Sequence, residues 1–113
     1  MSRDIVTLAD IYIALVRIRE FVAAMTRDSF LVDRKTQSAV LHQMMIIGEA
    51  AKRLSAKFLQ AHPEVNWKER AGLRDVLIHQ YDDVSLQWVW DLIVAEFPEL
   101  LPRVAQILPY PPI

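Results

Sequence analysis

The stretch "LADIYIALVRIREFVAAM", residues 8–25, decides the fold class of this chain of 113 residues. Its apolar residues recur at alternating intervals of three and four. That spacing places them in one row along an α-helix, as in a seam that packs against another helix at a shallow angle. The stretch therefore predicts a first helix, with Thr7 as its N-cap. The seam consists of Leu8, Ile11, Leu15, Ile18, Val22 and Met25.

The same pattern returns over residues 40–58 and predicts a second helix. A second apolar stripe of Leu41, Met45 and Gly48 runs beside the main one, so this helix is expected to contact more than one partner. Gly48 would let another backbone come close. Glu49 and Arg53 have the spacing and order of an i,i+4 ion pair. The main row is Val40, Met44, Ile47, Ala51, Leu54 and Phe58.

Two further helices follow the break at "AHPEVNW", residues 61–67. Asn66 with Glu69 three residues later is typical of a capping box, so the third helix should start at Trp67 and end near residues 79–80. The turn "YDDVS", residues 81–85, offers Asp83 or Ser85 as the cap of the next helix. Residues 84–97 are apolar nearly all round, which indicates burial on several sides.

The C-terminal segment keeps helical period but contains Pro98 and Pro102, which should kink or restart it. Residues 108–113, "LPYPPI", are expected to form an irregular tail. No repeat and no strand is indicated. The chain is therefore predicted to be a single all-α domain over residues 1–113, a compact bundle of four or five helices.

Composition narrows the class of protein. The hydrophobic fraction of 53% with only two glycines suggests extra buried surface, such as an oligomer interface. No apolar run is long enough to cross a bilayer, and Asp4 and Asp10 interrupt what a signal peptide would keep apolar. The absence of cysteine excludes disulfides and thiolate metal sites. A cytoplasmic protein is expected.

The distribution of charge argues against a general nucleic-acid coat. The net charge is −1, with nine Lys/Arg and six Asp/Glu in residues 1–60 but four and eight in residues 61–113. Any contact with an anionic polymer must come from a local patch. Lys52, Arg53 and Lys57 form the obvious candidate for RNA-backbone contacts, although the same residues would also suit an ordinary solvated helix face.

The stretch "GLRDVLIHQY", residues 72–81, carries the candidate chemistry. The guanidinium of Arg74 matches phosphate oxygens, and the imidazole of His79 can exchange a proton near neutral pH. RNA supplies its own nucleophile in the 2′-hydroxyl, so neither a metal nor a protein nucleophile is required. Arg74 and Tyr81, seven residues apart, would share a stripe on a continuous helix. His79 lies about 140° around from Arg74, so one straight helix does not aim both at one atom. Either the helix loosens at its C-terminal turn, or the site is assembled from two copies of the helix.

Two interpretations of this stretch remain open on spacing alone. Either two copies of the helix assemble a site for phosphodiester cleavage, or His79 only satisfies the carbonyls and dipole of a helix C-terminus. Asp75 could orient Arg74 or a histidine of the partner chain, although its charge is unfavourable beside phosphate.

Three ordered segments resemble the HEPN-domain toxins of the HepT type. "RDVLIHQY" matches the family's R-x4-H-x-Y signature, "MIIGEAAKRLS" its second-helix segment and "VWDLIVAEFPELLPRV" its closing helices. The resemblance implies a helical bundle that dimerises through the signature and C-terminal helices. It also implies a metal-independent RNase without a cofactor, acting on RNA such as tRNA or mRNA, in a type VII-like toxin–antitoxin pair.

The resemblance also implies residue roles. Arg74 and His79 would be the catalytic pair of a site shared across the homodimer, and Asp75 would support it. Tyr81 matches the tyrosine that the partner, a nucleotidyltransferase antitoxin, modifies with AMP. Asp75 is a departure, because an amide would suit phosphate better. The rival hypothesis is a catalytically silent helical module that binds a nucleotidyltransferase.

Overall fold

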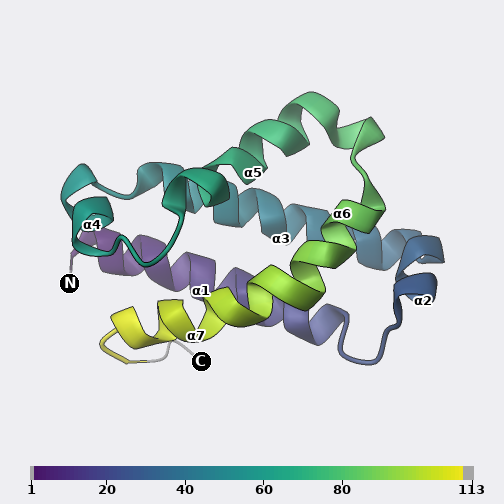
Figure 1. Cartoon of the computed structure of the whole chain (residues 1–113), viewed down its shortest axis with the longest axis horizontal. Coiled ribbons are helices and arrows are strands. Elements are labelled where there is room, and N and C mark those ends of the chain that lie inside the picture. The colour runs from purple at the N-terminus through teal and green to yellow at the C-terminus, as the bar shows by residue number, and fades with distance from the viewer. Residues whose placement is uncertain (1, 111–113) are drawn as a thin grey trace.

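Two long antiparallel helices, α1 (Arg3–Phe21) and α3 (Arg34–Arg53), form the centre of the fold in the computed structural model, which describes residues 2–110 (Figure 1). The helix α5 (Trp67–Gln80) packs on α3, and the C-terminal helix α7 (Phe97–Ile107) packs on α1. No β-strand occurs between residues 2 and 110. The all-α prediction is confirmed. In the same part of the chain, no helix is both long enough and apolar enough to span a membrane.

The predicted seams form the core. Leu8, Ile11, Leu15 and Ile18 of α1 are buried against the row on α3, whose Val40, Met44 and Ile47 are completely inaccessible to solvent. As the second stripe predicted, α3 has more than one partner: it packs mainly against α1 and α5 and also contacts α2. The long helices are therefore held by burial of apolar rows rather than by ion pairs.

The first helix starts earlier than predicted. Ser2 caps it by accepting a hydrogen bond from the Ile5 N–H at 3.2 Å, whereas Thr7 is buried inside the helix. The prediction of Thr7 as the N-cap is therefore wrong. Residues 3–7 include the charged residues Arg3 and Asp4, so their hydropathy pattern alone does not predict that the helix begins at Arg3.

The second predicted helix is two helices. The backbone of Leu54 is extended, and α4 (Ala56–Ala61) begins after the cap Ser55. The carboxylate of Asp4 accepts hydrogen bonds from the Ser55 N–H at 2.9 Å and from its hydroxyl at 2.6 Å. These bonds lower the pKa of Asp4, mainly through the Ser55 side chain. The break thus depends on a residue of α1 that is remote in sequence.

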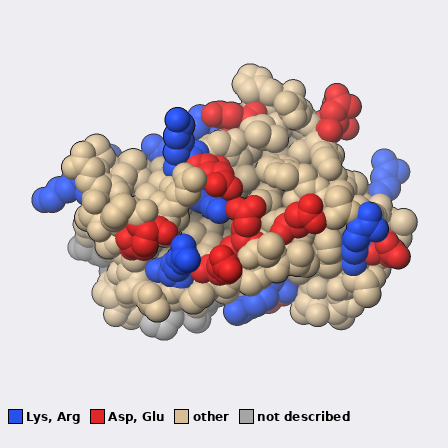
Figure 2. All heavy atoms as spheres, in the orientation of Figure 1, with Lys and Arg blue, Asp and Glu red and all other residues tan. Residues whose placement is uncertain are grey.

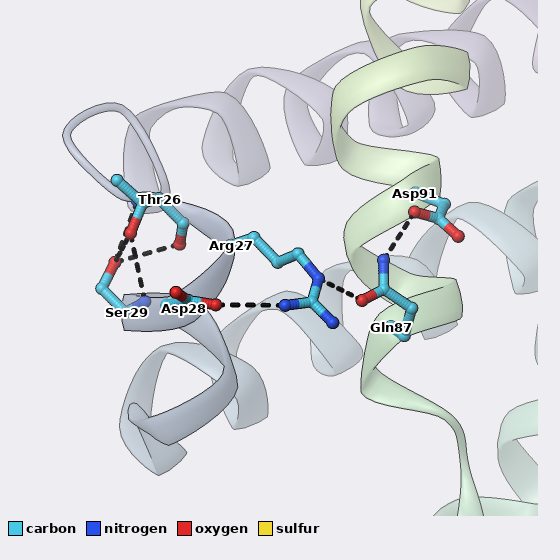
Figure 3. A network of polar contacts seen from close by, with 6 residues as sticks. All are labelled: Thr26, Arg27, Asp28, Ser29, Gln87 and Asp91. Carbon is cyan, nitrogen blue, oxygen red and sulfur yellow. Dashed lines mark hydrogen bonds and ion pairs between the residues drawn. The ribbon is translucent and has the colours of Figure 1, made fainter.

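A short helix not predicted from the sequence, α2 (Arg27–Val32), closes the far end of the bundle. Thr26 and Ser29 form a capping box at its start, and Arg27 donates a hydrogen bond to Gln87 of α6 (Leu86–Asp91) (Figure 3). Gln87 in turn donates to Asp91 at 2.8 Å. Beneath this polar network the rings of Phe30 and Trp90 lie 5.4 Å apart, so α2 is tied to α6 by both polar and apolar contacts.

The C-terminal helices are continuous through an unusual turn. Ser85 caps α6, as one of the two alternatives predicted. The π-helical segment η2 (Leu92–Glu96) then leads directly into α7, which contains both Pro98 and Pro102. Pro98 has no N–H and its ring crowds the carbonyl four residues earlier, so a wider turn just before it relieves the conflict. The helix ends at Ile107; residues 111–113 of the predicted irregular tail lie outside the described residues.

Candidate functional site

The helix α5, which carries the candidate residues, begins and ends close to where the sequence predicted. Asn66 caps it by accepting from the Glu69 N–H at 3.1 Å, and the Asn66 amide donates to the Glu69 carboxylate at 3.1 Å. The last α-helical residue is Gln80. The predicted cap therefore forms, and the helix that it starts packs against α3.

Gly48 of α3 lies directly against the backbone of Arg74. A Cβ atom at position 48 would be 2.5 Å from the Arg74 nitrogen and 2.7 Å from the Arg74 Cβ, closer than real Cβ atoms approach other heavy atoms. The prediction that Gly48 admits a neighbouring backbone is confirmed. The neighbour is the backbone of the candidate catalytic arginine, so the close approach of α3 and α5 occurs at the site itself.

The guanidinium of Arg74 is held from α3. Its Nε donates a hydrogen bond to Glu49, and its Nη1 lies 3.7 Å from the Asp75 carboxylate. The hydrogen bond to Glu49 raises the pKa of Arg74, with smaller contributions from the charges of Glu49 and Asp75. The Arg74 side chain is 32% exposed. Arg74 is therefore a fixed, permanently charged cation that solvent still reaches.

The predicted i,i+4 pair between Glu49 and Arg53 does not form. Glu49 bonds to Arg74, and Arg53 lies 3.7 Å from Asp10 of α1. The two side chains leave α3 toward different partners, because α3 is packed between α1 and α5. The sequence analysis missed Glu49 as a site residue. The available signal was its position directly after the glycine that admits another helix.

Asp75 is paired with Lys52 of α3. The Lys52 Nζ donates to Asp75 Oδ1 at 2.6 Å. This hydrogen bond is the main reason that the pKa of Asp75 is lowered, and the positive charges of Lys52, Arg74 and His79 add to it. The negative charge of Asp75, which is unfavourable beside phosphate, is therefore paired with the positive charge of Lys52.

The three predicted RNA-backbone contacts do not form one cluster. Lys52 faces α5 and bonds to Asp75, whereas Arg53 pairs with Asp10 on α1. Lys57 is exposed on the separate short helix α4. On the face shown in Figure 2, acidic side chains occupy the centre and basic ones lie among and around them. That face carries no continuous basic patch, and only Lys52 lies beside the candidate residues.

His79 is exposed on the last turn of α5. It follows Asp75 by four residues, so the two side chains share one face of the helix, and the His79 charge contributes to lowering the Asp75 pKa. Five residues separate His79 from Arg74, which lies on α5 as well. Within one chain, the proton-exchanging group and the fixed cation are therefore carried on different faces of α5.

Tyr81 is displaced from the regular path of α5. Gln80 has φ −133° and ψ 25°, and Tyr81 begins the 3-10 turn η1 (Tyr81–Asp83). The prediction that Tyr81 shares the stripe of Arg74 assumed an unbroken helix and is wrong in that detail. The Tyr81 side chain is nevertheless accessible, since the residue is 49% exposed.

A second arginine of α5 has a structural role. Arg70 lies one turn before Arg74, but it is buried and its Nη2 donates to Glu96 of η2 at 2.8 Å. This bond is the main cause of the lowered pKa of Glu96. Arg70 thus links α5 to the C-terminal helices and is not a cation available to a substrate.

The main pockets found among residues 2–110 are not lined by Arg74, Asp75, His79 or Tyr81. A largely apolar pocket of about 370 Å³ lies between α1 and the C-terminal helices, and none of the predicted site residues lines it. Among residues 2–110, no three His, Asp or Glu side chains are grouped as metal ligands. What the chain offers is a surface site of an anchored cation, a compensated carboxylate and an exposed imidazole.

Comparison with known proteins identifies the family of the chain. The family model for the HepT-like ribonucleases matches residues 11–107. A protein of Methanocaldococcus jannaschii named "Putative RNase" is 39% identical over 101 residues, covering 89% of this chain and 84% of its own. The "Probable ribonuclease HepT" of Thermococcus cleftensis is 41% identical over 93 residues, covering 82% and 84%. No solved structure matches the chain. The chain belongs to the HepT-like ribonuclease family.

Proposed function

We propose that this protein is a toxin of a type VII-like toxin–antitoxin pair, a metal-independent endoribonuclease that acts in the cytoplasm through Arg74 and His79. Membership of the HepT-like ribonucleases supports the RNase activity. The observation that carries the assignment of residues is the anchored, partly exposed guanidinium of Arg74 on the same short helix as the exposed His79. Together they supply the fixed positive charge and the proton exchange that RNA cleavage requires.

In the proposed reaction, a histidine accepts the proton of the RNA 2′-hydroxyl, and the 2′-oxygen attacks the adjacent phosphorus. The bond from phosphorus to the 5′-oxygen breaks, leaving a 2′,3′-cyclic phosphate. A protonated imidazole gives its proton to the departing 5′-oxygen. Arg74 stabilises the additional negative charge on the phosphorane, where a preorganised cation acts most strongly.

A homodimer is proposed because each chain offers one histidine in this region for two proton transfers. The outer side of α5 is free to meet a second copy: α5 packs mainly on α3, and Ile78 is 46% exposed on its last turns. Val94 of the C-terminal helices is 53% exposed as well. Two α5 helices meeting through this side would bring His79 of one chain near Arg74 of the other.

We further propose that a nucleotidyltransferase antitoxin silences the enzyme by adenylylating Tyr81. The phenol oxygen would attack the α-phosphorus of ATP, lose its proton and release pyrophosphate. The half-exposed side chain on η1 is accessible to such a partner, two residues beyond His79. The added AMP would place a bulky anion next to the proposed catalytic surface and compete with the RNA phosphate for its cations.

RNA is expected to contact exposed cations of α3 and α4. Lys57 on α4 is exposed and available for the RNA backbone, and Arg53 retains a long exposed side chain next to Asp10. Lys52 is expected to act mainly through Asp75, its hydrogen-bond partner. The RNA target, whether tRNA or mRNA, is to be identified by the same experiment that tests cleavage.

A second candidate function is a silent module that binds a nucleotidyltransferase. The observation in its favour is that two carboxylates, Glu49 and Asp75, lie beside the Arg74 guanidinium. In this account Arg74 and His79 serve only protein contacts.

The deciding experiment compares purified wild type and His79→Ala on total RNA, including tRNA, in the presence of EDTA. We expect the wild type to cleave and His79→Ala to be inactive with its helical circular dichroism intact. Mass spectrometry must show Tyr81 unmodified in both preparations. If neither protein cleaves although Tyr81 is unmodified, the RNase proposal fails and the binding module is the better account.

A further inference from the structure

We infer that Glu49 is a positioning residue for the proposed site: it holds Arg74 by the Nε edge, so that the Nη edge of the guanidinium faces an RNA phosphate. The expected effect on RNA cleavage rests on the proposed function. The position of Glu49 against Arg74 comes from the contact between α3 and α5 and does not depend on that function. It assigns a functional residue on a helix that carries none of the signature motif.

The first step is the rigidity of the backbone beneath the pair. Gly48, the neighbour of Glu49, touches the Arg74 backbone so closely that a Cβ would lie 2.5 Å from the Arg74 nitrogen. Glu49 therefore starts from a part of α3 whose distance from α5 is fixed by direct contact. From such a position the Glu49 carboxylate can hold the Arg74 guanidinium in one orientation, whereas a carboxylate on a mobile loop could not.

The second step is which edge of the guanidinium Glu49 uses. An arginine presents five N–H donors in a rigid fork, and phosphate is best held by two parallel bonds. Glu49 accepts from Nε, and among residues 2–110 neither Nη1 nor Nη2 has a hydrogen-bond partner. The anchored edge and the free edge are thus distinct. A carboxylate that blocked substrate would be expected on the Nη edge instead.

The third step concerns the other carboxylate. Asp75 Oδ1 lies 3.7 Å from Arg74 Nη1, beyond hydrogen-bond distance, and accepts from Lys52 at 2.6 Å. Lys52 follows Glu49 by three residues on α3, so one turn of that helix serves both neighbours on α5. Glu49 bonds directly to the Arg74 guanidinium, whereas the closer partner of Asp75 is Lys52 and not Arg74.

Three variants of the 113-residue chain test the inference. Glu49→Ala removes the acceptor, and Glu49→Gln keeps a side-chain oxygen of similar reach without the charge. Glu20→Ala is the matched control, since Glu20 is an exposed glutamate near the end of α1 and no hydrogen bond or ion pair of its side chain is found among residues 2–110. Circular dichroism checks that each variant folds.

The first measurement does not depend on catalysis. The Nε–Hε resonance of Arg74, identified by its loss in Arg74→Lys, is followed in proton–nitrogen NMR spectra. We expect a signal shifted from that of solvated arginines in the wild type and in Glu20→Ala, lost to exchange or moved to the solvated position in Glu49→Ala, and largely retained in Glu49→Gln. An unchanged Arg74 resonance in Glu49→Ala overturns the inference.

The second measurement is RNA cleavage. We expect kcat of Glu49→Ala to fall by about tenfold to a hundredfold with a much smaller change in KM, as for a misplaced transition-state contact. Glu49→Gln should recover most of the rate. Cleavage by Glu49→Ala at or above the wild-type rate also overturns the inference, because Glu49 would then compete with substrate. If the wild type itself does not cleave, the proposed function fails, and the NMR result alone decides whether Glu49 positions Arg74.

Discussion

Gly48 and Arg74 are in backbone contact, and this contact sets the distance between the helix that holds the core together and the helix that carries the proposed chemistry. No side chain fits between them: a Cβ on residue 48 would lie 2.7 Å from the Cβ of Arg74. The same contact therefore affects both the packing of α3 on α5 and the point from which the Arg74 side chain leaves α5. A change at position 48 must affect both.

The two glycines provide a matched pair of predictions. Gly48→Ala should destabilise the protein by about 1–3 kcal/mol, because overpacking at the contact outweighs the gain of about 1 kcal/mol in helix propensity. Gly72→Ala should be neutral or stabilising by up to about 1 kcal/mol, because a Cβ there has no heavy atom within 4 Å. Urea denaturation at one fixed protein concentration measures both. Equal stabilities of the two variants would contradict the close contact.

A double-mutant cycle distinguishes two roles of Lys52, neutralisation of Asp75 and direct contact with RNA. If Lys52 mainly neutralises Asp75, then Lys52→Ala should reduce RNA cleavage, and adding Asp75→Asn should restore most of it. If Lys52 contacts RNA directly, the loss should persist in the Asp75→Asn background. Lys35→Ala, at an exposed lysine near the start of α3, serves as the control for a general loss of positive charge. We expect the restored outcome, because Lys52 and Asp75 lie 2.6 Å apart.

The ion pair between Lys52 and Asp75 should contribute little to the free energy of unfolding. Both side chains are well exposed, at 39% for Lys52 and 51% for Asp75, so solvent screens their attraction and Lys52→Ala should change the free energy of unfolding only slightly. The effect on cleavage is expected to be larger than this. A variant that loses activity and stability in proportion would argue against an electrostatic role at the site.

The bond between Asp4 and Ser55 predicts a dependence of stability on pH. The pKa of Asp4 is lowered in the folded protein from its ordinary value of 3.8, mainly by the Ser55 side chain. The ionised carboxylate therefore stabilises the fold at neutral pH, and this contribution disappears as the pH falls through the folded pKa, below 3.8. Asp4→Asn should be less stable than wild type at pH 7, and the difference should shrink under strongly acidic conditions. Thermal unfolding between pH 7 and pH 3 follows this difference.

Tyr81 provides a prediction about regulation. Co-expression with the proposed nucleotidyltransferase antitoxin should add one adenylyl group per chain to the wild type and none to Tyr81→Phe. Tyr12→Phe is the control, because Tyr12 is a half-buried tyrosine of α1. Intact-mass spectrometry and peptide mapping identify the site. Modification of Tyr81→Phe at the wild-type level would exclude Tyr81 as the acceptor.

The helices and their caps were largely predictable because both are encoded locally. The apolar rows of α1 and α3, the Asn66 cap with Glu69 and the Ser85 cap each follow from residues within a few positions of one another. One error came from a distant residue, because Asp4 of α1 bonds to Ser55 where the second predicted helix breaks. Others were local: Ser2 rather than Thr7 caps α1, and the regular helical path ends at Gln80, before Tyr81.

By itself, the sequence determined an all-α chain of the HepT-like family and named Arg74, Asp75, His79 and Tyr81, since periodicity, capping residues and a signature motif are all read along the chain. Only the tertiary structure decided the partners of the long charged side chains. Glu49 has a cation within reach on its own helix, Arg53, yet bonds across to Arg74. That choice depends on the distance between α3 and α5, which is set by a contact at Gly48 between residues far apart in the sequence.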